Sequence, residues 1–256
     1  MVDLHTLQII ALLLLAGAVG GFLNTAASSG SAVTLPALIA LGLHPMLANT
    51  TNRVPVLIGF AVAIWKFHRA GEMPWREGTR FTLVMVAGAV IGAIAAAAID
   101  DYNTSLVVTA AVIMALAVLC VNPARWLRAD HTHLPRETGP FVMFLMFLVG
   151  IWTGLVVLDS GTYTLAVLVL AAHYSIRQAN AIKALAIGTA VAVSLLIFGW
   201  HGQVEWAWAI PLSIGSILGS LAGVRLALSP HAAKWVFRLL LAVLAFEVIR
   251  LVAGLL

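Results

Sequence analysis

Long apolar runs separated by short polar connections make up most of the chain. Eight runs reach the ~20 residues that a membrane-spanning helix needs: 4–26, 46–67, 81–99, 104–122, 138–158, 178–199, 206–228 and 232–254. Two others, 31–43 and 162–173, are shorter, and at ~1.5 Å per residue each covers about 20 Å of a core about 30 Å thick. Because each directly follows a polar break, we expect two half-helices that begin near the middle of the membrane.

The two polar breaks resemble each other, which indicates an internal repeat. Ser28-Ser29-Gly30 is followed by Ala48-Asn49, and 131 residues further along Asp159-Ser160-Gly161 is followed by Ala179-Asn180. The same offset matches Phe67 to Phe198, Gly71 to Gly202, Trp75 to Trp206, Gly88 to Gly219 and Gly92 to Gly223. The pattern predicts two homologous halves, with a first repeat over 1–124, a cytoplasmic linker over 125–137 and a second repeat over 138–256. An interrupted helix in each half is how many secondary transporters build a binding site near the midplane.

The distribution of charge orients these segments. Lys and Arg gather in four connections, whereas those around Asp3, His44, 100–101 and 201–205 hold none. The positive-inside rule places the four basic connections in the cytoplasm. Each half then has five membrane segments, and an odd number inverts the second half relative to the first, with both termini outside. A parallel 4+4 repeat is the alternative, but it leaves Arg177 and Lys183 on the outer side.

The composition supports an all-α integral membrane protein. The chain is 62% hydrophobic and 9% charged, whereas a soluble domain carries roughly 25% charged residues. The first apolar run has no basic stretch before it, so we expect a retained helix rather than a cleaved signal peptide. The single cysteine, Cys120, excludes an internal disulfide and a Cys-rich metal site. The basic residues are spread over short loops, which argues against nucleic acid as a partner.

The polar breaks are the first candidate site. The first N–H groups of a helix have no partner within that helix, and inside a membrane they must find one. The side chains of Ser29, Asp159 and Ser160 could cap them. An anion bound at the helix start is the alternative, favoured by the helix dipole.

Arg53 and Lys183 are the charged candidates. Arg53 ends the polar run Asn49-Thr50-Thr51-Asn52 and lies ~12 Å inside its span, where a charge costs at least ~2.5 kcal/mol. Lys183 aligns with Asn52 in the second half and lies at a shallower depth. Each side chain could bind an anion or extend to the membrane interface.

Asp159 is the candidate for proton coupling. A carboxylate at a membrane break is costly unless it is paired or protonated. Its negative charge would compete with a bound anion, so its protonation would favour anion binding. A plain N-cap for the following half-helix is the alternative.

At this point the residues resemble a known family, over nearly the whole chain. The glycines of Gly17-x-x-Gly20-Gly21, then Ser29-Gly30, Pro36-Ala37-Leu38, Gly42, Pro45 and Ala48-Asn49-Thr50-Thr51, look like the repeated signature of the sulfite exporter TauE/SafE family. Gly150, Gly154, Ser160-Gly161 and Ala179-Asn180 carry the resemblance in the second half. The usual three glycines are replaced at both breaks, and the second half lacks the proline, so substrate identity is the least transferable property.

The resemblance implies a permease of the inner membrane for sulfite, sulfonates or related small organic anions, driven by an ion gradient. We therefore expect a multi-pass secondary transporter that exports a sulfonate such as sulfoacetate, or sulfite. The expected substrate site comprises Ser28, Ser29, Gly30, Asn49, Thr50, Thr51, Arg53, Ser160, Gly161, Asn180 and Lys183. We expect no enzyme activity, no metal and no cofactor; a homodimer is left open. The alternatives are a passive anion channel and a permease for carboxylates.

Overall fold

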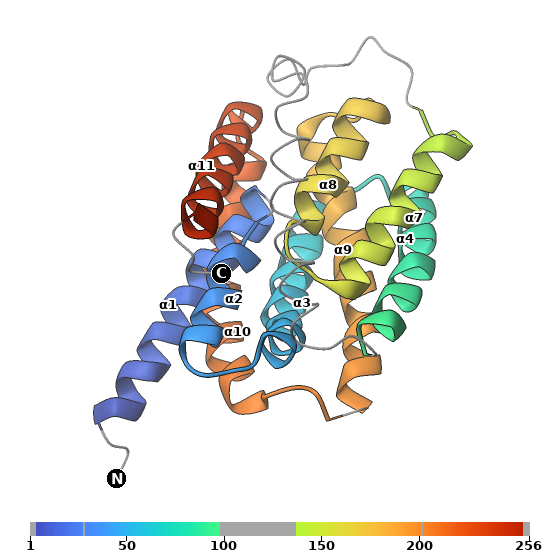
Figure 1. Cartoon of the computed structure of the whole chain (residues 1–256). Helices are drawn as coiled ribbons and strands as arrows, with labels where there is room; N and C mark the ends of the chain where they lie inside the picture. Colours follow the sequence, from blue (N-terminus) through green and yellow to red (C-terminus); the bar gives the residue numbers. More distant parts are fainter. Residues whose placement is uncertain (1–3, 28, 98–136, 201, 253–256) are drawn as a thin grey trace.

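The computed structural model describes residues 4–27, 29–97, 137–200 and 202–252, and within these ranges all regular structure is helical (Figure 1). The elements are α1 (Leu4–Ala26), α2 (Ser31–Ala40), α3 (Pro45–Arg69), α4 (Trp75–Ala96), α7 (Pro140–Leu155), α8 (Ser160–Ala166), the π-helical η1 (Val167–Ala171), α9 (Ile176–Trp200), α10 (Trp206–Ala227) and α11 (Ala232–Val252). Among these, α1, α3, α4, α9 and α10 have the length and hydropathy to cross a membrane. The all-α prediction is confirmed.

Most helix bounds follow the predicted apolar runs, but α4 begins at Trp75 rather than at 81, and α7 has 16 residues, shorter than the full-length span predicted over 138–158. Both expected half-helices are present, as α2 in the first half and as α8 with η1 in the second. Pro45 and Pro140 begin α3 and α7, where proline loses no intrahelical hydrogen bond. The expected span 104–122 lies outside the described residues, as does the expected linker except for its last residue.

Two turns matched by the repeat offset have the same backbone form. Gly71 after α3 and Gly202 after α9 have φ of +71° and +68°, which favours glycine. The amide that follows each glycine donates to the carbonyl of the matched phenylalanine, Phe67 or Phe198, at 3.1 Å in both cases. The two turns therefore share one backbone conformation and one hydrogen-bond pattern.

Glycine-lined helix pairs form the tightest contacts. α1 packs along α10, and α7 packs along α4. A Cβ added to Gly17 would lie 2.1 Å from the Leu212 carbonyl oxygen, and one added to Gly150 would lie 2.2 Å from that of Met85. Because the obstacle is backbone in both pairs, only glycine allows this approach.

Each of these pairs joins the first half to the second. Each helix of the first half has a counterpart in the second: α7 for α1, α8 for α2, α9 for α3 and α10 for α4. When every helix is replaced by its counterpart, the main pairs of helices in contact are the same. The pair α1–α10 then becomes α7–α4, and α3–α10 becomes α9–α4, while α3–α9 is unchanged. The helices of the two halves are thus interleaved.

The loops show how α3 and α9 run relative to each other. Arg177 at the start of α9 lies 3.8 Å from Glu72 after α3, and it also donates to the Ser229 carbonyl before α11. At the opposite end, the Glu205 amide after α9 donates to Thr51 Oγ1 near the start of α3, at 3.0 Å. The two helices are therefore antiparallel, as Figure 1 also shows.

Candidate functional site

The two predicted polar breaks meet inside the protein. We call the connection between α1 and α2 the first break, and the connection between α7 and α8 the second break. Ser29 Oγ of the first break donates to Asp159 Oδ1 of the second at 2.7 Å, and it lies 3.2 Å from Thr162 Oγ1. All three side chains are fully buried. Residues that are distant in sequence thus form one polar centre.

The second break is held by two residues of the first half. Arg53 Nη1 donates to the Thr153 carbonyl at 2.9 Å, and Nη2 donates to those of Gly154 at 2.7 Å and Leu155 at 3.3 Å. Asn49 donates to the Leu155 carbonyl at 3.0 Å and accepts from the Val157 amide at 3.3 Å. These carbonyls belong to the last turn of α7, the negative end of its dipole. Arg53 therefore caps a helix of the other half.

Arg53 is enclosed on its remaining sides. Its side chain has no exposed surface, and the guanidinium carbon lies 4.8 Å from the centroid of the Phe198 ring. Its Nε has no hydrogen-bond partner among the described residues. The side chain thus remains within the protein and does not extend to the membrane interface.

At the first break, a lysine of the second half binds the carbonyls at the end of α1. Lys183 Nζ donates to the carbonyls of Asn24 at 3.0 Å and Ala27 at 3.3 Å, at the end of α1. Its third bond goes to Asn180 Oδ1 at 2.7 Å. Within the first half, the Gly30 amide donates to Asn24 Oδ1 at 3.0 Å. Lys183 is fully buried and, like Arg53, does not reach the interface.

A second polar cluster follows the first break along α2. Thr34 Oγ1 donates to Asn52 Oδ1 at 2.6 Å, and Asn52 Nδ2 donates to Ser31 Oγ at 3.0 Å. All three side chains are buried. This cluster ties the first half-helix to α3.

The side-chain caps that were one alternative for the breaks are not formed by the described residues. Asp159 precedes α8 with φ of 56°, and its carboxylate makes no capping bond to that helix. Ser160 Oγ donates backwards to the Val157 carbonyl at 2.9 Å. Ser29 bonds to the opposite break instead. Ser29 and Asp159 therefore join the two breaks to each other instead of capping the helices that follow them.

Thr50 and Thr51 lie away from the contact between the two breaks. Thr50 Oγ1 donates to the carbonyls of Leu47 and Gln203, and Thr51 accepts from Glu205, so both are bound to the α9–α10 loop. Gly161 is buried in α8, and Ser28 lies outside the described residues. Sequence reasoning missed Asn24, Ser31, Thr34 and Thr162, although polar side chains within apolar runs are themselves a signal of function.

The charges around the breaks do not balance. Among the described residues, the buried side chains with formal charge are Arg53, Asp159 and Lys183. Neither cation forms an ion pair with a carboxylate of the described residues, since their partners are carbonyl and amide oxygens. Among the described residues, the formal charges of these three buried side chains therefore sum to one net positive charge. No group of three His, Cys, Asp or Glu suited to a metal occurs in the described part of the chain.

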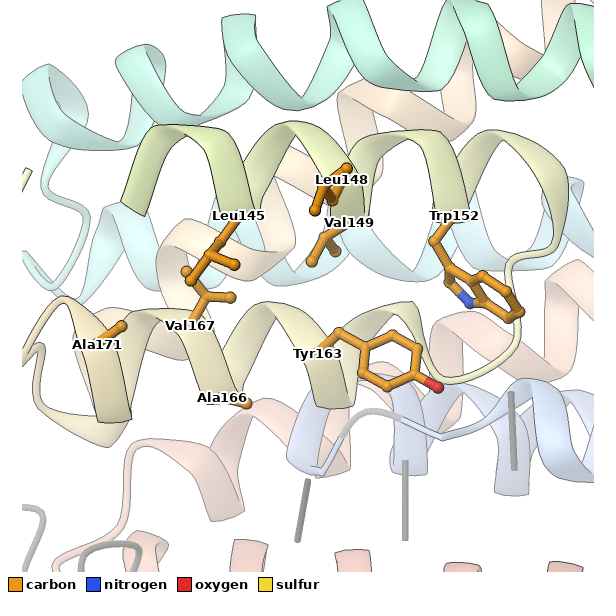
Figure 2. A pocket seen from close by; sticks show the side chains of 8 residues that line it. All are labelled: Leu145, Leu148, Val149, Trp152, Tyr163, Ala166, Val167 and Ala171. Carbon is orange, nitrogen blue, oxygen red and sulfur yellow. The ribbon is translucent and has the colours of Figure 1, made fainter. Parts of the chain in front are cut away.

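An apolar groove lies beside the second break, between α7 and the α8–η1 helix. It has a volume of about 460 Å³ and is lined by Leu145, Leu148, Val149, Trp152, Tyr163, Ala166, Val167 and Ala171. Figure 2 shows Trp152 and Tyr163 at the end nearest the break. Their rings meet edge to face at 5.9 Å, and Trp152 Nε1 donates to the Leu158 carbonyl at 2.9 Å.

Known proteins similar to this chain are membrane transporters. The family model described as "Sulfite exporter TauE/SafE" matches residues 13–248. The "Probable membrane transporter protein ORF9" of a Sinorhizobium species is 27% identical over 249 residues, which cover 96% of this chain and 93% of that protein. The "Probable membrane transporter protein YfcA" of Escherichia coli K12 is 26% identical over 213 residues, covering 82% and 77%. No solved structure matches the chain significantly. These descriptions are of transporters and not of enzymes.

Proposed function

Because this chain belongs to the sulfite exporter TauE/SafE family, we propose that it is a secondary transporter that exports a sulfonate such as sulfoacetate, or sulfite. It is a multi-pass transporter of the plasma membrane. The observation that carries the proposal is the net positive formal charge of the buried side chains, among the described residues, at two breaks that face each other. One small anion would neutralise it, and low-dielectric surroundings strengthen that attraction.

The proposed substrate site lies between the two breaks. All three protons of the Lys183 ammonium already have protein acceptors, and both terminal nitrogens of Arg53 bind carbonyls. We therefore give these residues the role of fixed positive charges. Direct contacts with the anion would come from Ser29 and the backbone of Gly30, whose present bonds to Asp159 and Asn24 would have to break, and from the backbone of Ser160 and Gly161 across the centre. Asn49 and Asn180 would position the breaks.

We also propose that the halves form an inverted repeat that alternates access to this site. The interchangeable packing of the halves and the antiparallel course of α3 and α9 support this arrangement. Ser29 and Asp159 are both 0% exposed, so the centre is closed to both sides here. Transport would require their hydrogen bond to break on opening.

Asp159 is the proposed proton-coupling group. Its protonation would remove the negative charge that faces Ser29 and leave a more positive centre. Anion binding to the wild type should therefore strengthen as the pH falls. Asp159→Asn should bind the anion at high pH as tightly as the wild type does at low pH. An unchanged pH dependence in this variant would exclude Asp159 as the coupling group.

Binding to the purified protein tests the proposal most directly. Thermal unfolding and calorimetry would be followed with sulfite, sulfate, sulfoacetate, taurine, thiosulfate and acetate. We expect saturable stabilisation by sulfite or a sulfonate, weakened in Ser29→Ala. Ser194→Ala is the matched control, because Ser194 is also fully buried but donates at 2.8 Å to Ala190 of its own helix.

Three outcomes would contradict the proposal. Preferential stabilisation by acetate would indicate a carboxylate permease. Loss of binding equal in Ser29→Ala and Ser194→Ala would place the site elsewhere. Non-saturable anion flux in liposomes, with no counterflow, would indicate a passive channel.

A further inference from the structure

The ammonium group of Lys183 lies in an arrangement of oxygens that is complete without any carboxylate. The carbonyls of Asn24 and Ala27 and the side-chain oxygen of Asn180 lie 2.7–3.3 Å from Nζ. An ammonium has three N–H donors, so each donor has one acceptor. The oxygens are neutral, and the two carbonyls are at the negative end of the α1 dipole.

These oxygens are positioned by groups other than Lys183. The carbonyls belong to the backbone at the end of α1, which is held against α10 by backbone contact at glycines. Asn180 is oriented by its own amide nitrogen, which donates to the Ile176 carbonyl at 3.0 Å. The three oxygens therefore form a cradle that should persist when the lysine side chain is shortened.

We propose that this cradle is a monovalent-cation site, which Lys183 fills with its own ammonium. Unwound backbone and helix C-terminal carbonyls are groups that bind coupling cations in transporters. The separations of 2.7–3.3 Å suit a cation of the size of NH4+ or K+ better than the smaller Na+. The lysine thus occupies the position that a free ion would take. The inference concerns this oxygen set and does not depend on the identity of the exported anion.

The Arg53 position does not offer an equivalent site. Its two terminal nitrogens bind different carbonyls, those of Thr153 and Gly154, and Asn49 Nδ2 donates at the same helix end. A planar fork fits such spaced acceptors, whereas a single spherical ion does not. Arg53→Ala therefore serves as a control.

The experiment compares Lys183→Ala with Lys183→Met in the full chain in detergent. Alanine leaves room for an ion, whereas methionine fills the volume without charge. Unfolding midpoints would be measured in chlorides of NH4+, K+, Na+ and choline at equal ionic strength. We expect Lys183→Ala to be less stable than the wild type in choline and to regain several degrees, saturably, in NH4+ and K+. The wild type, Lys183→Met and Arg53→Ala should not discriminate among the cations.

An unfolding midpoint of Lys183→Ala that is the same in all four salts would overturn the proposal, as would an equal response of Lys183→Met. If Lys183→Ala cannot be recovered folded, the double variant Lys183→Ala/Asn180→Asp decides. Its carboxylate replaces a neutral ligand of the cradle and should tighten cation binding. If the folded double variant has the same unfolding midpoint in NH4+ and K+ as in choline, the cation site is also excluded.

Discussion

The two breaks are stabilised by the same principle but with different side chains. At each break, a cation from the opposite half binds the last carbonyls of the helix that ends there. At the second break Arg53 spreads over three consecutive carbonyls, and at the first break Lys183 gathers two carbonyls and an amide oxygen at one point. The difference indicates that a positive charge at each helix end is the shared requirement, and that the cation type sets the local geometry.

The asparagines that follow the breaks sharpen this comparison. Asn49 and Asn180 are matched by the repeat offset. Asn49 binds the backbone of the opposite break directly, whereas Asn180 reaches the first break only through Lys183. At the first break, Asn24 of the same half binds the Gly30 amide instead. The matched asparagines therefore make different contacts in the two halves.

The largest effect is expected from removing the cation of the second break. Arg53→Ala deletes three charge-assisted hydrogen bonds to buried carbonyls, so we expect a loss of about 3 kcal/mol in the free energy of unfolding. Arg53→Lys keeps the charge but cannot bridge spaced carbonyls, and should lie in between. Thermal and denaturant unfolding in detergent would measure both. Equal stability of Arg53→Ala and the wild type would remove Arg53 from its capping role.

A second prediction disturbs the glycine contacts that bring the halves together. The Cβ of Gly92→Ala would lie 2.0 Å from the Ile151 carbonyl oxygen, so α4 and α7 must separate. We expect a loss of about 2 kcal/mol from this overpacking. Gly199→Ala is the control, because nothing lies within 4 Å of its added Cβ. If both variants unfold alike, the close approach of α4 and α7 is not a source of stability.

A third prediction separates the two matched serines at the breaks. Ser29→Ala loses its contacts with Asp159 and Thr162, and Ser160→Ala loses its bond to Val157, each worth about 1 kcal/mol. Only Ser29 crosses between the breaks, whereas Ser160 bonds to Val157 of its own break. We therefore expect a lower unfolding midpoint in Ser29→Ala than in Ser160→Ala, and an altered pH dependence of anion binding in Ser29→Ala alone. Identical pH profiles in both variants would contradict the link between the breaks.

The smallest effect is expected at the ends of α3 and α9. Glu72 and Arg177 lie 3.8 Å apart, with side chains 31% and 38% exposed. An ion pair in this setting contributes less than about 1 kcal/mol. Glu72→Gln should change the unfolding midpoint only slightly, and less so in high salt. If Glu72→Gln lowered the free energy of unfolding as much as Arg53→Ala, the contact between the end of α3 and the start of α9 would stabilise the fold as much as the breaks do.

Much of the architecture could be predicted from the sequence because lipid imposes a strict rule. A membrane-spanning segment must satisfy its own backbone, so it is apolar and about 20 residues long. That rule placed α1 at 4–26 and located both half-helices after their polar breaks. It also identified Arg53, Asp159 and Lys183 as functional candidates, since buried charge is costly. Apart from Asn180, which is three residues from Lys183, the partners described above for these charges lie 100 or more residues away and were not visible in the sequence.

The sequence by itself therefore determined where helices form, where they break and which positions repeat. These properties depend on local composition and on the spacing of matched residues. Only the tertiary structure decided that Arg53 binds the end of α7, that Lys183 binds the end of α1 and that Ser29 meets Asp159. The physical reason is the interleaving of the halves. Glycine contacts bring distant backbones together, and that approach decides which carbonyls lie within reach of each buried charge.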